Sequence, residues 1–265
     1  MTINLIFRYL LKNVLGIKLN PILLNWINIE DLDWNELSHN ASAVHLLKKN
    51  IDKINWRELS LNTSPEAIKL LEENPEKIHW KELSANISAI KLLEDNLQMS
   101  KDKGIKSNID WCWLSSNSNA IHMLKNNPEN IDWEELSGNT SAIDLIEDEL
   151  IQAEYEARPD KIDWMRLSGN YSAIHILKNN PYKTHWWWLS TNKNALEYFE
   201  NDENKSKIHW DEVCRLSSAI HIIERNPNRI YWDSLSVNPA AIHILEANKN
   251  YINWGELSSN TAIFE

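Results

Sequence analysis

The sequence predicts an all-α protein, an α-solenoid of about ten short helix–turn–helix repeats of 22–31 residues. The pattern Trp-x-x-Leu-Ser-x-Asn recurs along the chain, and Ala-Ile, leucine and Asn-Pro follow it at similar offsets. The tryptophans of this pattern are Trp34, Trp56, Trp80, Trp111, Trp133, Trp164, Trp186, Trp210, Trp232 and Trp254. Repeats of this length are typical of stacked units that bury apolar surface against their neighbours. Polar and apolar residues nowhere alternate for long, so no strand is predicted.

The predicted organisation has two parts: residues 1–29 form an N-terminal capping helix and a degenerate first repeat, and residues 30–265 form the solenoid. Residues 1–29 carry Arg8, Lys12 and Lys18 and no acid. Arg8 and Lys12 interrupt the apolar stretch and no small-residue cleavage site follows, which argues against a secretory signal peptide. We expect a helix that covers the end of the stack. The alternative is an amphipathic helix over residues 1–16 that lies on a membrane surface.

Each repeat opens with a short helix. In the repeat that begins at Asp132, this residue is an N-cap and Glu135 follows three residues later, which is the spacing of a capping box. Gly138 and Asn139 then end the helix. The sequence predicts one to two helical turns here.

A second helix follows the turn in each repeat. In residues 172–177, Ala173, Ile174 and Leu177 form one apolar stripe at helical spacing. The helix is expected to end at Asn180-Pro181, because Asn tolerates a left-handed C-terminal conformation and Pro cannot continue the helix. A short link with one apolar residue then leads to the next tryptophan.

The repeated residues are predicted to be structural. We expect the tryptophans to be wedges buried between neighbouring repeats rather than ligand platforms. The asparagine six residues after each tryptophan is predicted to form an internal polar ladder, and the serine before it to share that role. One repeat has Leu216 in place of this asparagine and Cys214 in place of the serine, so we expect it to be locally irregular.

Five histidines share one position of the second helix: His45, His122, His175, His221 and His243. Other repeats carry Lys, Asp or Glu at that position, so we expect an exposed stripe and not a metal site. Cys112 and Cys214 are four repeats apart, beyond disulfide reach, and are predicted to be thiols. The sequence indicates no cofactor.

Composition and motifs restrict the function. The net charge of −11 argues against nucleic acid as the main partner, which would require clustered positive charge. The sequence lacks the glycine-rich phosphate-binding, HExxH and GxSxG motifs, and its acid pairs lie at helix-capping positions. We therefore predict that the protein is not an enzyme.

Departures from the repeat are the candidate binding residues. Trp113, Trp187 and Trp188 are extra tryptophans at positions where other repeats carry polar residues. Exposed tryptophan is enriched at binding hot spots, so these residues are predicted to contact a partner. The alternative is packing beneath a neighbouring insertion.

Two repeats are longer by nine residues. The insertion near 97–108 carries Lys101, Lys103 and Lys106, and the one near 147–160 carries Glu154 and Glu156 among other acids. Both extend the same part of the repeat, so we expect both on one face, two repeats apart. They either approach each other, form a dipolar patch for a protein partner, or are solvated loops without a role. At the C-terminus, Phe264 is a candidate plug for the end of the stack.

The segments 131–139 and 173–181 resemble the Trp-x-x-Leu-Ser-x-Asn tandem-repeat proteins of giant DNA viruses related to mimivirus. The resemblance covers residues 30–265. It implies a viral origin and expression in an infected host cell, and it carries over no catalytic residue.

The predicted function is a non-enzymatic repeat scaffold that mediates protein–protein interaction, acting in the infected host cell. The alternatives are a structural or assembly component of the virus particle and a membrane-tethered adaptor. We expect the protein in the host cytoplasm or the virion, and not secreted.

Overall fold

The computed structural model describes residues 27–263, and the regular secondary structure of this part consists of α-helices and short 3-10 helices, with no strand. The predicted fold class, an all-α solenoid of short helix–turn–helix repeats, is confirmed. The chain divides into two compact units, Met1–Met123 and Leu124–Glu265. The expected capping helix, all but the last three residues of 1–29, and the expected plug at Phe264 lie outside the described residues.

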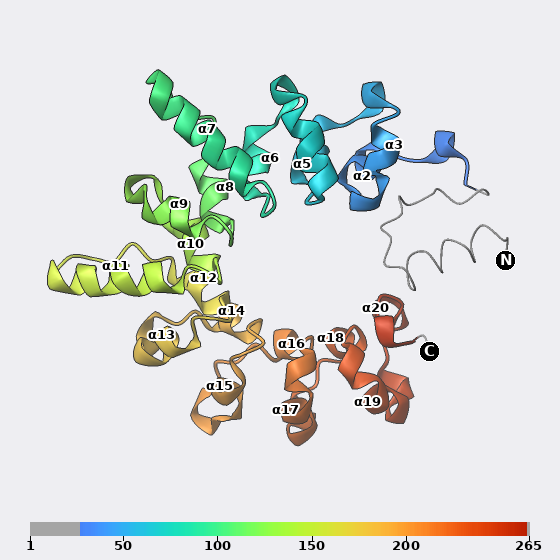
Figure 1. Ribbon diagram of the computed structural model, residues 1–265. Coiled ribbons are helices and arrows are strands. Elements are labelled where there is room, and N and C mark those ends of the chain that lie inside the picture. The colour runs from blue at the N-terminus through green and yellow to red at the C-terminus, as the bar shows by residue number, and fades with distance from the viewer. Residues whose placement is uncertain (1–26, 264–265) are drawn as a thin grey trace, which may run out of the picture. The chain divides into compact units, whose positions relative to one another are not determined.

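Each unit consists of two rows of helices (Figure 1). In the first unit the first helices of the repeats are α2 (Trp34–His39), α4 (Trp56–Leu61), α6 (Trp80–Ala85) and α8 (Trp111–Ser116). The second helices are α3 (Val44–Leu47), α5 (Pro65–Glu72), α7 (Ile90–Lys103) and α9 (Ile121–Lys125), and α9 crosses the boundary between the units. Contacts join α2 to α4, α4 to α6 and α6 to α8, so first helices stack on first helices.

The second unit repeats this arrangement. Its first helices are α10 (Trp133–Gly138), α12 (Trp164–Gly169), α14 (Trp186–Ser190), α16 (Trp210–Val213), α18 (Trp232–Ser236) and α20 (Trp254–Leu257). Its second helices are α11 (Ile143–Tyr155), α13 (Ile174–Asn179), α15 (Leu196–Glu200), α17 (Ile220–Arg225) and α19 (Ile242–Ala247). Each first helix contacts the next one along the chain, from α10 to α20.

The predicted N-cap Asp132 accepts from the backbone N–H of Glu135 (3.1 Å). In other repeats the backbone N–H that a capping-box glutamate would bind is taken by the preceding repeat. The Asp163 carboxylate accepts from the backbone N–H of Arg166 (2.8 Å), as an N-cap does. The backbone N–H of Asp163 donates to Ser137 Oγ of the preceding repeat (3.0 Å), and that of Asn55 donates to Ser38 Oγ in the same way (3.0 Å). The serine therefore has the role that the glutamate of a capping box was expected to have.

The second helices end at Asn-Pro, but not through a left-handed residue. Asn180 has φ −131° and ψ 56°, and its side-chain Nδ2 donates to the carbonyl of Ile176 (2.9 Å). Pro181 then begins a short 3-10 helix, Pro181–Lys183, where the missing N–H costs nothing. A left-handed residue follows each of the two long second helices: Gly104 (φ 64°) after α7, and Ala157 (φ 50°) after Glu156 at the end of α11.

Leucine, alanine and isoleucine make up most of the buried core. The prediction that the repeated tryptophans are buried wedges is wrong for nearly all of them. The leucine three residues after the tryptophan is fully buried in most described repeats, as at Leu59, Leu83, Leu136 and Leu167. Of the ten repeated tryptophans, Trp210 is buried, Trp254 is exposed and the rest are half-buried. Leucine fills the space between stacked first helices, which leaves the larger indole at the edge of the junction.

A side chain from the following link covers several of these half-buried indoles. Lysine Nζ lies 4.8 Å from the ring centroid of Trp34, 5.4 Å from Trp133, 4.6 Å from Trp164 and 5.1 Å from Trp186. At Trp232 the cover is Tyr251, stacked with its centroid 4.8 Å away. The tryptophans thus form a partly exposed column stabilised by cation–π and aromatic contacts.

The predicted asparagine ladder is confirmed. Asn170 Nδ2 donates to the carbonyls of Ser137 (3.1 Å) and Asn139 (3.2 Å) in the preceding repeat, and its Oδ1 accepts from the N–H of Ser172 (3.0 Å). The same contacts across a junction are made by Asn86, Asn117, Asn192 and Asn260. The carbonyls at the end of a helix lack an intrahelical partner, and the amide of the next repeat supplies it.

The repeat with Leu216 is irregular, as expected. Its first helix, α16, has four residues, and the Cys214 thiol takes the place of the serine hydroxyl by accepting from the N–H of Tyr231 (3.5 Å). Asn238 Nδ2 donates to the carbonyl of Cys214 (2.9 Å). The asparagine bond across this junction therefore keeps its ordinary length, and only the bond at the serine position is longer.

Candidate protein-binding surfaces

The three extra tryptophans do not share one environment. Trp113 lies on α8 in the first unit with 42% of its surface exposed, and Lys81 Nζ lies 5.6 Å from its ring centroid. Trp187 and Trp188 lie next to each other on α14 in the second unit, and Trp187 is 37% exposed whereas Trp188 is half-buried. We therefore describe Trp113 and the pair on α14 as separate candidates.

Trp188 has a packing role. A Cβ atom added at Gly169, on the preceding first helix, would lie 3.2 Å from the Trp188 ring. The indole therefore occupies the space left by the missing side chain of Gly169, and a larger residue there would have to displace it. The rings of Trp187 and Trp188 meet edge to face, with centroids 5.0 Å apart and planes at 86°. Trp188 holds Trp187 in place, and Trp187 is the residue that faces solvent.

Further partly apolar residues lie on the first helices near Trp187. Met165 occupies the position of Trp187 in the preceding repeat and is 46% exposed. Beside it on α12, Arg166 forms ion pairs with Glu134 (2.9 Å) and Glu135 (2.9 Å) of α10. We call Met165, Trp187 and this ion-paired group the α12–α14 surface. It combines apolar residues with a charged rim.

The two insertions are helical extensions and not loops. They lengthen the second helices α7 and α11 to 14 and 13 residues. Lys101 and Lys103 lie exposed in the last turn of α7, and Lys106 follows the left-handed Gly104. The lysines belong to the first unit and the acidic insertion to the second, so each is a surface of its own unit.

Two basic residues of the acidic insertion, Arg158 and Lys161, partly neutralise its negative charge. Glu149 is buried, accepts two bonds from the Arg158 guanidinium (2.6 and 3.1 Å) and accepts the N–H of Lys161 (3.1 Å). Burial alone would raise the pKa of Glu149, but the Arg158 bonds and the charge of Lys161 outweigh it and hold the pKa below its usual value. Glu156 binds the same guanidinium through Nε (2.6 Å). Of the two predicted glutamates, Glu156 is thus a structural partner, and Glu154 is exposed to solvent.

In both extensions, a buried side chain at the same helix position accepts a hydrogen bond from the backbone of the link that follows. Asn96 on α7 is buried, and its Oδ1 accepts from the N–H of Asn108 (3.1 Å). Glu149 holds the corresponding position on α11 and accepts from the N–H of Lys161. In shorter repeats this position is the asparagine that ends the second helix, as at Asn180.

Three histidines of the predicted exposed stripe are exposed and two, His45 and His221, are half-buried. The stripe also links repeats, which the sequence reasoning missed. His175 Nε2 lies 2.8 Å from Glu147 of the preceding second helix, and His243 Nε2 lies 2.8 Å from Glu224. Where the histidine position is acidic, the charges are exchanged: Lys178 of the preceding helix pairs with Glu197. The signal was present in the sequence, because the two positions of successive repeats carry opposite charges.

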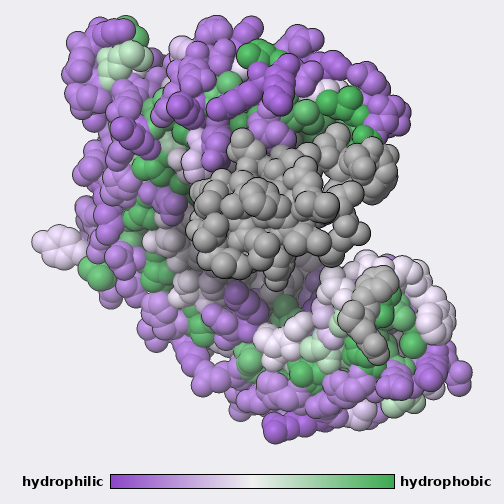
Figure 2. All heavy atoms as spheres, turned by 45° about the vertical axis from the view of Figure 1, so that its right-hand side comes forward, coloured by the Kyte–Doolittle hydropathy of each residue, from purple (hydrophilic) through white to green (hydrophobic). Residues whose placement is uncertain are grey.

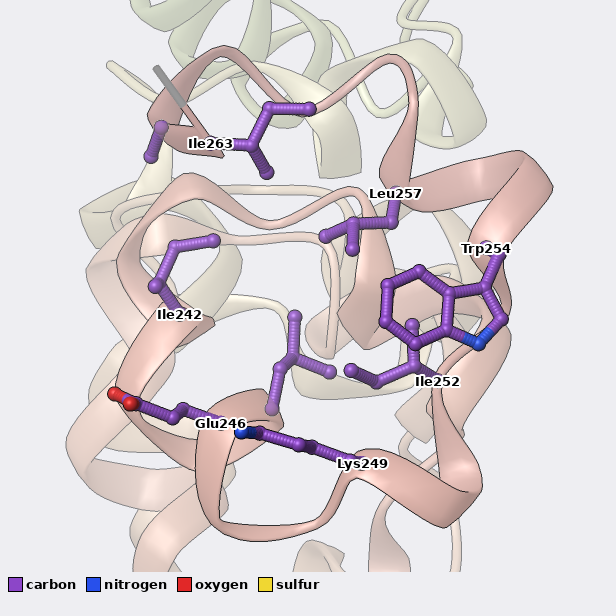
Figure 3. A pocket seen from close by; sticks show the side chains of 9 residues that line it. Ile242, Glu246, Lys249, Ile252, Trp254, Leu257 and Ile263 are labelled. Carbon is purple, nitrogen blue, oxygen red and sulfur yellow. The ribbon is translucent and has the colours of Figure 1, made fainter. Parts of the chain in front are cut away.

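A hollow of about 370 Å³ lies at the C-terminal end of the second unit. Figure 3 shows the side chains of Ile242 and Ile263 on one side, facing Ile252, Leu257 and Trp254 on the other. The equivalent leucine of the preceding repeat, Leu235, is fully buried, whereas Leu257 is half-buried. This is the surface that earlier repeats of the unit bury against the next first helix.

The remaining surface is largely hydrophilic in the view of Figure 2, with hydrophobic residues in small separate areas. The described residues contain no group of three His, Cys, Asp or Glu arranged to hold a metal ion. No helix in this part of the chain is both long and apolar enough to cross a membrane. Comparison of the chain with protein-family models, with curated proteins and with solved structures gave no match in any of the three.

Proposed function

We propose that the protein is a non-enzymatic repeat scaffold that binds another protein through the α12–α14 surface, with Trp187 at its centre. The observation that carries this proposal is the exposed ring of Trp187, which packs edge to face against Trp188. The Trp188 ring in turn fills the space beside Gly169. An indole held rigidly at the surface loses little conformational entropy on binding, and such residues dominate many protein interfaces.

The charges around Trp187 fit the same proposal. Interfaces commonly have an apolar centre and a polar rim. Met165 adds apolar area on the preceding helix, and the ion-paired Arg166 with Glu134 and Glu135 lies beside it. The position of Trp187 is variable in the stack, because Arg57, Glu134 and Asp233 stand there in other repeats. The fold therefore does not demand an aromatic residue at this place.

Two carboxyls with shifted pKa values, Glu82 and Asp160, take part in ion pairs of the stack itself. Burial raises the pKa of Glu82, but the hydrogen bond from Arg57 outweighs this effect and the pKa is lowered. At Asp160 the bonds from Lys183 and the Trp164 indole likewise outweigh burial and lower the pKa. Each shift is explained by an ion pair that joins neighbouring repeats. Perturbed groups of this kind stabilise the stack and need no substrate to account for them.

The test is site-specific photo-crosslinking from position 187 in the full chain, in the cells that express it, with the same photo-reactive residue at position 113 as the comparison. A partner captured from 187 is then purified, and its Kd is measured for wild type and Trp187→Glu. A central hot spot predicts a loss of about 2 kcal/mol or more, about 30-fold in Kd.

Two outcomes would overturn the proposal. One is a Kd that Trp187→Glu leaves unchanged while far-UV circular dichroism shows the variant folded. The other is capture of nothing but virus-particle components, at high copy and in amounts that the variant does not alter, which would favour a structural role in a particle.

A further inference from the structure

The extension of α11 carries an exposed apolar face. Ile151 is 67% exposed and Tyr155 is 90% exposed, and they lie one helical turn apart on the same side of the helix. In Figure 1 this end of α11 runs out past α13. Two large apolar side chains so exposed on one turn are not explained by packing within the chain.

A hollow of about 350 Å³ adjoins this face, between the end of α11 and the link that follows α13. Ile151, Ala153 and Pro159 give it apolar walls, and Glu154, Asp160 and Lys183 give it charged ones. The hollow is large enough for one or two side chains of a partner and is open to solvent at its mouth.

The base of the hollow is fixed by ion pairs. The buried Glu149 holds the Arg158 guanidinium through two bonds. Asp160 accepts from Lys183 Nζ (2.6 Å) and from the Trp164 indole (2.9 Å), which joins the insertion to α12 and to the link after α13. Because these bonds position the walls before any partner arrives, binding here would cost little reorganisation.

The charge around the hollow indicates what kind of segment fits. Residues 147–161 contain six carboxylates and two permanent cations, and Lys183 adds a third cation from the neighbouring link. All three cations are already paired with carboxylates, whereas Glu154 makes no ion pair within the described residues. The excess negative charge favours a partner that brings lysine or arginine beside its apolar residues.

The first unit contains a natural comparison. On α7 the positions of Ile151 and Tyr155 are held by Gln98 and Asp102, whose side chains hydrogen-bond to each other (2.8 Å). A helical extension of this kind can therefore form with a polar outer face. The apolar residues on α11 are a property of that surface and not a requirement of the fold.

We propose that the apolar face of α11 and its hollow bind a short protein segment in which large apolar side chains are flanked by lysine or arginine. This site shares no residue with the α12–α14 surface. The result for one surface therefore does not decide the result for the other.

The test uses the purified full chain and two fluorescent peptides of the same apolar pattern, one of leucine and lysine and the other of leucine and glutamate. We expect the leucine–lysine peptide to bind at least about 10-fold more tightly than its acidic counterpart, because opposite charges attract and like charges repel at the mouth of the hollow. The double variant Ile151→Gln/Tyr155→Asp, which carries the residues of α7, should lose about 10-fold in affinity or more.

Control variants separate this site from others. Met99→Gln removes an exposed apolar residue from α7 and should leave peptide binding unchanged, as should Trp187→Glu. Because Ile151 and Tyr155 are exposed, the double variant should keep the urea midpoint of wild type. Equal binding of both peptides, or wild-type affinity in the double variant, would overturn the proposal whatever becomes of the α12–α14 surface.

Discussion

Substitution of Asn170 by alanine tests whether the ladder joins the repeats. The Asn170 amide is buried and makes three hydrogen bonds, two of them to carbonyls of the preceding repeat. Alanine leaves the carbonyls of Ser137 and Asn139 and the N–H of Ser172 without this partner. At about 1 kcal/mol for each bond, and more where the abandoned group stays dry, the free energy of unfolding should fall by about 3 kcal/mol or more.

Asn40 provides the matched control at the same position of the first described repeat. It is exposed, and its side chain caps Ser42 (2.9 Å) without a bond to an earlier repeat among the described residues. Asn40→Ala should therefore cost about 1 kcal/mol, as the loss of a capping bond does.

The assay is urea unfolding followed by circular dichroism, together with native-state amide hydrogen exchange around residues 133–180. In a stack whose repeats contact only their neighbours, a weakened junction can open separately, so exchange near Asn170 should quicken more than exchange in distant repeats. The reasoning is refuted if Asn170→Ala and Asn40→Ala lose the same stability, or if Asn170→Ala loses less than about 1 kcal/mol.

Two further predictions concern ionisable groups. Burial raises the pKa of the Cys214 thiol, whereas Cys112 is exposed. Alkylation of the native protein at pH 8 should therefore modify Cys112 first, and Cys214 only as its repeat opens. Equal alkylation rates of the two cysteines, measured by peptide mass spectrometry, would contradict this. The lowered pKa of Glu149 stabilises the fold above the usual value of 4.5, and this contribution is lost as the pH falls through the pKa of the folded state. The difference in urea midpoint between wild type and Glu149→Gln should accordingly be largest near pH 7 and shrink below pH 4.5, and a difference that does not change with pH would count against it.

The sequence predicted the features that depend on spacing along the chain. The tryptophan period, the caps and the Asn-Pro pairs were sufficient to predict short helix pairs, the ladder and the irregular repeat at Leu216. The sequence-based prediction failed where the hydrogen-bond partner of a group comes from another repeat. In the repeat that begins at Asn55, the N–H that a capping-box glutamate would bind is taken by Ser38 Oγ of the preceding repeat, and a single repeat read alone cannot show that the serine is used.

The candidate surfaces were predictable only in part for the same reason. The sequence marked Trp187 and Trp188 together, but the void at Gly169 that separates packing from exposure lies on another helix. The insertion on α11 was interpreted from its charges, and its apolar face was missed because Ile151 and Tyr155 become neighbours only once the insertion is helical.

The way in which the stack is held together also explains where variation is tolerated. The register of the repeats is set by buried backbone contacts, from asparagine amides and serine hydroxyls to the ends of the preceding helix, together with fully buried leucines. None of these involves the residue directly after the repeated tryptophan or the outer face of an extended second helix. A tryptophan at 187 or an isoleucine at 151 can therefore arise without loss of the fold. In a solenoid of this kind, the positions with the weakest structural constraint are the ones on which a binding surface can be built.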